Sequence, residues 1–116
     1  MDITRVPVGV ICKVKTWWGV SYNGTIIDKK RKKLEGKLPL FLEIKTSKGY
    51  DMLIDQNDII SCEAVEYDEM YFKSLLDYKA CNKCGSEKIG VAYNNHNGKV
   101  KEIWCGQCRN QLWINK

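Results

Sequence analysis

Four cysteines, arranged as two Cys-x-x-Cys pairs, are the residues of this chain best suited to chemistry. Cys81 and Cys84 form the first pair, Cys105 and Cys108 form the second, and 20 residues separate the pairs. Each pair can place two thiolates on one tight turn, and one β-hairpin between the pairs can bring both turns to a single metal ion. Four thiolates fill a tetrahedral shell and leave no position for a substrate. The spacing therefore predicts a structural zinc site.

Paired cysteines have two other uses, as disulfides or as a redox-active Cys-x-x-Cys. The chain shows no apolar leader after Met1 and no stretch near the roughly 18 apolar residues that a membrane span requires. We therefore expect a cytoplasmic protein, where such pairs favour metal over disulfides. Neither pair lies between a strand and a long helix, which argues against a redox motif of the thioredoxin type.

The residues around the cysteines read as a small β-structure. Residues 88–93 and 100–104 are expected strands on either side of a polar turn, 94–98, and residues 111–114 are a third short strand. With its two cysteine pairs, the segment 81–116 resembles the zinc-ribbon family. That resemblance implies a structural zinc ion held by the four cysteines.

Residues 6–66 read as all-β, because apolar side chains alternate with polar ones over several short runs. Five strands in about sixty residues predict a small closed barrel. Asn23-Gly24 falls inside one of these runs and is alternatively a type I′ hairpin turn, which would add a strand. Cys12 and Cys62 lie on the apolar side of their strands, so we expect them in the core. The five expected strands lie near residues 8–14, 19–27, 40–44, 50–54 and 60–64.

The run from Trp18 to Ile27 resembles the aromatic-x-Gly-Thr-Ile strand of Tudor, KOW and Sm-like small barrels, and residues 58–60 resemble the turn into their final strand. The resemblance implies a five-stranded Src-homology-3-like or Tudor-like barrel. Barrels of this shape have many functions, so it constrains the fold more than the role.

Residues 67–80 read as a short helix linking the two modules. Asp68 is the expected N-cap, and four apolar residues follow at helical spacing. We expect this stripe to dock the ribbon against the barrel. The predicted organisation is mainly β, with a barrel at 1–66, a linking helix at 67–80 and a zinc ribbon at 81–116. The apolar stripe consists of Tyr71, Phe72, Leu75 and Leu76.

Residues 29–37, between two expected strands, hold six basic side chains. One interpretation is a solvated loop, and another is a loop that contacts phosphates while tryptophans stack on bases. Two adjacent tryptophans cannot both point inward from a regular strand, so at least one of Trp17 and Trp18 should be exposed. The candidate residues for binding nucleic acid or another partner are Trp17, Trp18, Lys29, Lys30, Arg31, Lys32, Lys33 and Trp113.

The formal net charge is +5, and residues 81–116 carry six basic and two acidic side chains. Mild basicity of this kind suggests nucleic acid as a partner. The sequence has no glycine-rich phosphate loop, no Gly-x-Ser-x-Gly and no His-Glu-x-x-His, so we do not expect an enzyme. The leading hypothesis is a zinc-binding adaptor associated with nucleic acid, or with a complex that processes it, in transcription or RNA metabolism. The alternatives are a protein-interaction module, such as a phage or bacterial inhibitor of a host protein, and a zinc-ribbon subunit of a larger enzyme. No membrane and no small-molecule substrate is expected.

Overall fold

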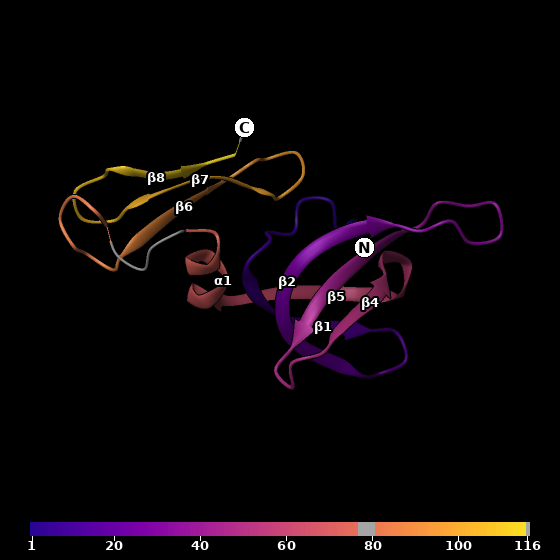
Figure 1. Cartoon of the computed structure of the whole chain (residues 1–116). Helices are drawn as coiled ribbons and strands as arrows, with labels where there is room; N and C mark the ends of the chain where they lie inside the picture. The colour runs from indigo at the N-terminus through magenta and orange to yellow at the C-terminus, as the bar shows by residue number, and fades with distance from the viewer. Residues whose placement is uncertain (77–80, 116) are drawn as a thin grey trace.

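The computed structural model describes residues 1–76 and 81–115. It consists of two antiparallel sheets with one short helix, α1 (Glu69–Ser74), between them in the chain (Figure 1). The larger sheet has the strand order β4-β3-β2-β1-β5, and the smaller sheet has the order β6-β7-β8. The larger sheet is formed by β1 (Val10–Thr16), β2 (Ser21–Arg31), β3 (Leu40–Thr46), β4 (Asp51–Asp55) and β5 (Ile59–Tyr67). The smaller sheet is formed by β6 (Ile89–Tyr93), β7 (Val100–Cys105) and β8 (Gln111–Ile114).

The larger sheet contains the five strands expected from the sequence, but it is open. Its two edges are β4 and β5, which do not pair with each other within the described residues, so the expected closure into a barrel is not seen. A single turn of 3-10 helix, η1 (Gln56–Asp58), connects these two strands and leads the chain from one edge of the sheet to the other. Asp55 accepts a hydrogen bond from the Asn57 amide and so fixes the start of this turn.

Strand β1 shows the alternation that its sequence predicts. Val10, Cys12 and Val14 are buried in the core, whereas Lys13 and Lys15 point outward. The core of this sheet is a cluster of twelve buried residues drawn from every strand and from the N-terminal segment. Cys12 lies in that cluster and Cys62 packs half-buried against it, so the core placement expected for both is confirmed.

Asn23 and Gly24 lie inside β2, so the hairpin-turn alternative is wrong. Gly24 is needed there because a Cβ atom at this position would lie 2.5 Å from the Lys45 carbonyl oxygen on β3. The strand also runs further than expected, through Lys29, Lys30 and Arg31. Three of the nine residues of the predicted basic loop therefore belong to the strand, and only the part beyond Arg31 connects β2 to β3.

Helix α1 begins where the sequence places it. Asp68 accepts hydrogen bonds from the amides of Met70 and Tyr71, as an N-cap does, and its other carboxylate oxygen accepts one from the Thr25 hydroxyl of β2. The helix ends at Ser74, earlier than expected, and the part of the expected helix at residues 77–80 lies outside the described residues.

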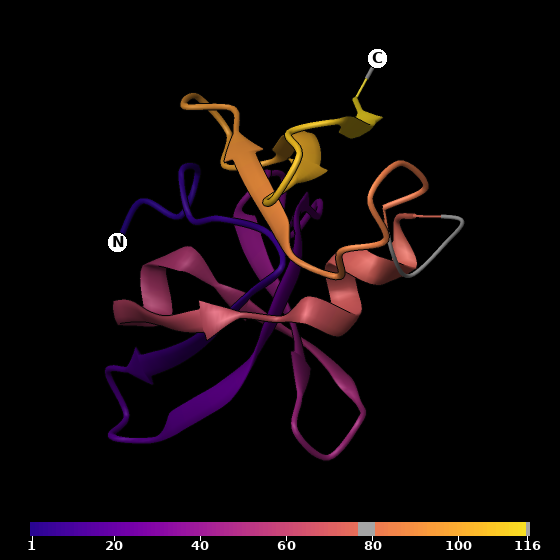
Figure 2. The ribbon, with the colours of Figure 1, turned by 90° about the vertical axis from the view of Figure 1, so that its left-hand side faces the viewer.

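The helix packs against the ribbon. Phe72 is fully buried in a second cluster with Val100 and Ile103 of β7, while Tyr71 and Tyr93 border both hydrophobic clusters. Figure 2 shows α1 beneath the three-stranded sheet. The docking role predicted for this apolar stripe agrees with these contacts.

A second contact joins the two modules at the tip of the β6–β7 hairpin. The amide of Val8 donates a hydrogen bond to the Gly98 carbonyl, 3.0 Å away. Gly98 has a φ of +68°, and a Cβ atom there would lie 2.4 Å from the Val6 carbonyl oxygen, so both the turn and the close approach require glycine. The ribbon is thus held at the helix and at the hairpin tip.

In the described part of the chain, no helix has the length and apolar character needed to cross a membrane.

Candidate metal centre and exposed surface

The two cysteine pairs adopt the same turn. In the first, the Cys81 amide donates to the Ser86 carbonyl and the Gly85 amide donates back to the Cys81 carbonyl. In the second, Cys105 exchanges the corresponding hydrogen bonds with Asn110 and Arg109. The residue after each second cysteine has a left-handed backbone, with a φ of 75° at Gly85 and 63° at Arg109. The chain therefore builds one type of knuckle twice.

These knuckles bring four sulfur atoms together at one end of the ribbon. All four Sγ atoms lie within 4.8 Å of one another. Cys81 Sγ is 3.6 Å from Cys108 Sγ, and Cys84 Sγ is 3.4 Å from Cys105 Sγ. Sulfurs each about 2.3 Å from one zinc ion in a tetrahedron would lie about 3.8 Å apart, so the cluster has the size that zinc requires.

Burial and hydrogen bonds orient the sulfurs. The first cysteine of each knuckle, Cys81 or Cys105, is buried, and the second, Cys84 or Cys108, is exposed. The amide of Lys83 points at Cys81 Sγ from 3.3 Å, and the amides of Gln107 and Cys108 point at Cys105 Sγ from 3.4 Å. Amides aimed at sulfur stabilise the thiolate, which is the form that binds metal.

The pKa values of the cysteines reflect this arrangement. Hydrogen bonds from the amides of Cys108 and Gln107 lower the pKa of Cys105 to about 6. The Ser86 amide lowers the pKa of Cys84, but the adjacent sulfurs, Cys105 foremost, outweigh it and raise that pKa to about 12. Sulfurs this close cannot all ionise unless a cation neutralises them. The donor set is four soft thiolates, which fits zinc, and metal uptake would release protons.

The four cysteines are the one group of three or more candidate metal ligands among the residues that the structure describes. A separate groove of about 670 Å³ lies between the β2–β3 end of the larger sheet and α1. Its described lining includes Asp51, Asp68 and Tyr71 but neither histidine nor cysteine. Asp68 is already committed to capping α1 and bonding Thr25.

The adjacent tryptophans lie at the turn between β1 and β2, and both are exposed. Trp17 is 66% exposed and Trp18 is 42% exposed, with their rings in an edge-to-face contact at 5.6 Å. Trp17 is held in place by Asp58, which accepts one hydrogen bond on its main-chain oxygen from the Trp17 amide and another on its carboxylate from the indole Nε1.

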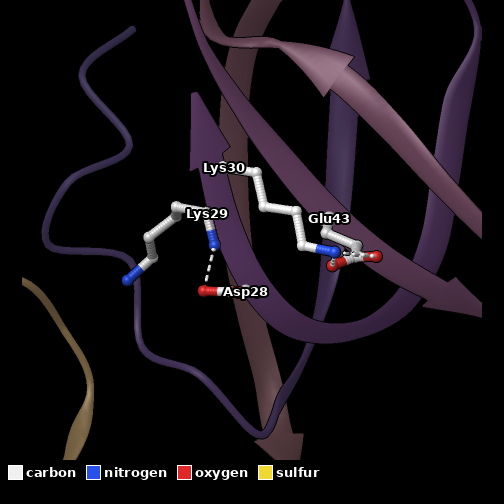
Figure 3. Close-up of polar contacts among 4 residues, drawn as sticks. All are labelled: Asp28, Lys29, Lys30 and Glu43. Carbon is white, nitrogen blue, oxygen red and sulfur yellow. Dashed lines mark hydrogen bonds and ion pairs between the residues drawn. The ribbon is translucent and has the colours of Figure 1, made fainter. Parts of the chain in front are cut away.

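The basic run is divided between structural and free side chains. Lys29 turns toward the ribbon, where its Nζ donates to the carbonyls of Asn97 and Thr4. Lys30 points the other way, and its Nζ lies 2.8 Å from Glu43 Oε1 (Figure 3). Arg31 donates to the Leu38 carbonyl. Lys32 and Lys33 are exposed.

Lys29 is the most perturbed of these cations. Burial lowers its pKa to about 8, and the charge of Lys99 acts in the same direction, while Asp28 opposes both. The Lys29 amide also donates to the Asp28 carboxylate at 2.8 Å (Figure 3). The partly buried Lys29 ammonium group, which donates to two main-chain carbonyls, connects the two modules. It is not available to a phosphate.

The two ribbon tryptophans are half-buried. Trp113 packs against the cluster that contains Phe72, and it lines a small cavity between the modules. Trp104 lies across Gly90 of β6, where a Cβ atom would be 2.3 Å from the indole. The structure thus brings Trp17 and Trp18 together but places Trp113 and the basic run elsewhere.

Sequence reasoning passed over three residues near the tryptophans. Lys13 and Lys15 lie on the outward side of β1, which ends just before Trp17, and Asp58 fixes the Trp17 ring. The alternation of β1 was a usable signal for the lysines, because it places positions 13 and 15 on one side. Nothing local predicts Asp58, which lies 41 residues from Trp17 in the chain.

Comparison of this chain with protein-family models, with curated proteins and with solved structures found no match.

Proposed function

We propose that this protein is a non-catalytic adaptor that a structural zinc ion stabilises and that binds nucleic acid in transcription or RNA metabolism. The observation that carries the metal part is the cluster of four cysteine sulfurs within 4.8 Å. Four thiolates complete the coordination of zinc, so the ion would hold the ribbon together and offer no position for a substrate.

The exposed tryptophan pair supports binding as the function. Large exposed indoles are uncommon on a protein surface without a partner, and Trp17 is held in one orientation by Asp58. Indole faces stack on unpaired bases, and the positive net charge attracts phosphates. A basic β-module with an exposed aromatic ring fits single-stranded nucleic acid.

A protein partner is the second candidate. Val20 is 44% exposed in the same turn as the tryptophans, and Ile60 is 63% exposed at the end of β5 that pairs with Thr16. Aliphatic side chains add nothing to base stacking, but they do contribute to protein interfaces with tryptophan at the centre.

Two measurements test the proposal. Mass spectrometry under native conditions should show one zinc ion per chain, and Cys105→Ser should lose it while Cys62→Ser keeps it, since Cys62 lies in the other module. Titration with a labelled single-stranded oligonucleotide at two ionic strengths should show binding that weakens with salt. A metal-free folded protein would contradict the first part. A wild type that binds no oligonucleotide even at low salt would contradict the second and favour a protein partner.

A further inference from the structure

We propose that single-stranded nucleic acid binds along the outward face of β1, with Lys13 and Lys15 contacting successive phosphates and Trp17 stacking on a base. This inference rests on the proposed function and specifies its site. The proposed binding site is on one strand of the larger sheet, β1, and does not include the basic run at residues 29–33.

Lys13 and Lys15 lie on one side of β1, and Trp17 follows in the turn at the end of that strand. Burial alternates from Val10 onward, so that Lys13, Lys15 and Trp17 are exposed while the residues between them are buried. Pairing with the chain before β5 continues past the end of β1, because the Trp17 amide donates to the Asp58 carbonyl. Alternate residues of a strand lie about 6.6 Å apart, so this is the spacing of Lys13 and Lys15, and Trp17 comes two residues later in the turn. An extended nucleic-acid strand can follow these residues for a few nucleotides.

The two ammonium groups on this side of β1 are free to bind an anion. Within residues 1–76 and 81–115, neither Lys13 nor Lys15 forms an ion pair or a side-chain hydrogen bond, in contrast to Lys29, Lys30 and Arg31. A phosphate on this face therefore displaces counterions and water but breaks no contact within the protein. The release of those counterions contributes favourably to the free energy of binding.

Trp17 is prepared for stacking before any ligand arrives. Its main-chain amide and its indole Nε1 both donate to Asp58, and its ring makes an edge-to-face contact with Trp18. A side chain already fixed in place loses little conformational entropy on binding. The indole N–H is already satisfied by Asp58, so the ring can offer its face to a base while its polar edge stays bonded.

The flanking strands add short polar side chains. Lys15 lies between Ser21 of β2 and Ser61 of β5, and Lys13 lies between Asn23 of β2 and Glu63 of β5. Hydroxyl and amide groups at these positions suit sugar and base edges. Glu63 is the one acidic residue among these four neighbours, and its carboxylate opposes a phosphate at Lys13. It should weaken binding.

The basic run is too far away to act on the same short ligand. Ser21, opposite Lys15, begins β2, and Arg31 ends it ten residues later, which is about 33 Å along the curved strand. Charges separated by much more than about 8 Å are screened at physiological salt. Lys32 and Lys33 lie beyond Arg31. Their side chains are exposed and have no partner in the described structure, so these two lysines provide a control pair with the same charge.

The experiment compares two double variants of equal charge, Lys13→Ser with Lys15→Ser and Lys32→Ser with Lys33→Ser. Each is titrated with short single-stranded DNA and RNA oligonucleotides over a range of salt. We expect the first double variant to bind more weakly and to lose about 1.4 from the slope of log affinity against log salt, since each contact with a single strand contributes about 0.7. The second double variant should keep the slope of the wild type.

Three further variants test the ring and the acidic neighbour. Trp17→Ala should bind about 5- to 150-fold more weakly with little change in salt slope, as expected when stacking on one base is lost. Trp17→Phe retains an aromatic face without the Nε1 hydrogen bond and should keep much of the affinity. Glu63→Gln should bind more tightly than the wild type. Thermal melting of each variant shows whether it is folded.

The outcomes separate this site from the proposed function. If the wild type binds and both double variants lose equal affinity and slope, the protein attracts nucleic acid by overall charge and the β1 site is wrong, although the proposed function stands. If the wild type binds and Trp17→Ala has no effect, stacking at this position is excluded. If the wild type binds no oligonucleotide, both the proposed function and this site fail, and the tryptophan surface belongs to a protein interface.

Discussion

Arg109 takes, in the second cysteine knuckle, the position that glycine takes in the first. Both residues have a left-handed backbone, with a φ of 63° at Arg109 and 75° at Gly85. The left-handed conformation costs a residue with a Cβ atom roughly 1–2 kcal/mol relative to its usual conformations, and glycine is spared that cost. The second knuckle is therefore under more strain than the first.

This difference predicts that substitutions at the two positions change the free energy of unfolding in opposite directions. With zinc in excess, Arg109→Gly should raise the free energy of unfolding by about 0.5–1 kcal/mol, and Gly85→Ala should lower it by about 1 kcal/mol. Chemical denaturation followed by tryptophan fluorescence measures both changes. Nothing described lies within 4 Å of a Cβ atom at Gly85, so steric clash does not complicate the second variant. A destabilised Arg109→Gly protein would show that the arginine side chain stabilises the knuckle.

The residue scale also shows where local sequence was informative. Spacing alone identified the four cysteines, because Cys-x-x-Cys dictates a turn and the turn dictates where the sulfurs point. Spacing did not reveal that Lys29 connects the two modules, since the acceptor of its ammonium group, the Asn97 carbonyl, is 68 residues away. A lysine in a basic run has the same local pattern whether it contacts solvent, phosphate or a distant carbonyl.

Among the secondary-structure elements, the β6–β7 hairpin closely approaches the N-terminal segment and β2 at its tip. Gly98 at its tip has a φ of +68° and faces the Val6 carbonyl and Lys29 Nζ, 2.4 and 2.8 Å from the position of a Cβ atom. Gly36, in the β2–β3 connection, has a similar φ of +79° but has nothing within 4 Å. The two glycines share a backbone conformation and differ in their surroundings.

Comparing alanine variants of Gly98 and Gly36 measures how much the close contact at Gly98 affects stability. Gly36→Ala should lower the free energy of unfolding by about 1 kcal/mol, the cost of a Cβ atom in this backbone conformation. Gly98→Ala should cost about 1–3 kcal/mol more, because the main chain at Val6 must shift. Equilibrium unfolding of both variants with zinc held constant gives the difference. Equal losses would mean that the hairpin tip does not hold the modules together.

Strand β2 shows why alternation predicts only part of an element. Up to Ile26 its residues pair regularly with β3, but the register shifts between Ile26 and Asp28, so Ile27 is an extra residue in the ladder. Such a bulge reverses the pattern of side chains that follows it. The strand therefore continues through the basic residues with a phase that the preceding sequence does not predict.

At the scale of the molecule, the described residues form two hydrophobic clusters of very different size. The larger sheet has twelve buried residues in its cluster, and the ribbon cluster has three, one of which is Phe72 of α1. A cluster that small cannot stabilise a module without help, so we expect the proposed zinc ion to supply much of the folding free energy of the ribbon.

Removal of zinc should therefore act unevenly across the chain. In the presence of a chelator, amides of β6, β7 and β8 should lose protection from hydrogen exchange, and those of α1 should follow because Phe72 loses its packing partners. Amides of β1, β2 and β3 should remain protected by their own core. Mass spectrometry of exchanged fragments resolves the two regions. Simultaneous loss of protection everywhere would show that the contacts at Lys29 and Gly98 make the molecule one cooperative unit.

At this scale the sequence predicted the strands and the docking of the helix, but not the other contacts between the two sheets. Five strands, a capped helix and a three-stranded ribbon follow from alternation, turn residues and cysteine spacing. The open edge of the larger sheet and the seating of the hairpin against Val8 depend on contacts between distant residues. Periodicity carries no information about which distant backbone groups meet.

The hydrogen bond from Val8 to Gly98 also determines the order in which parts of the chain can fold during synthesis. The donor and the acceptor are 90 positions apart, and a ribosome adding about 5–20 residues each second needs roughly 5–18 s to cover that distance along the chain. During that interval the Val8 amide lacks its acceptor, whereas the side chains of Ile3, Val6 and Val8 can already pack in the core of the larger sheet. The main chain at Val8 therefore makes its final contact only after the β6–β7 hairpin has been synthesised.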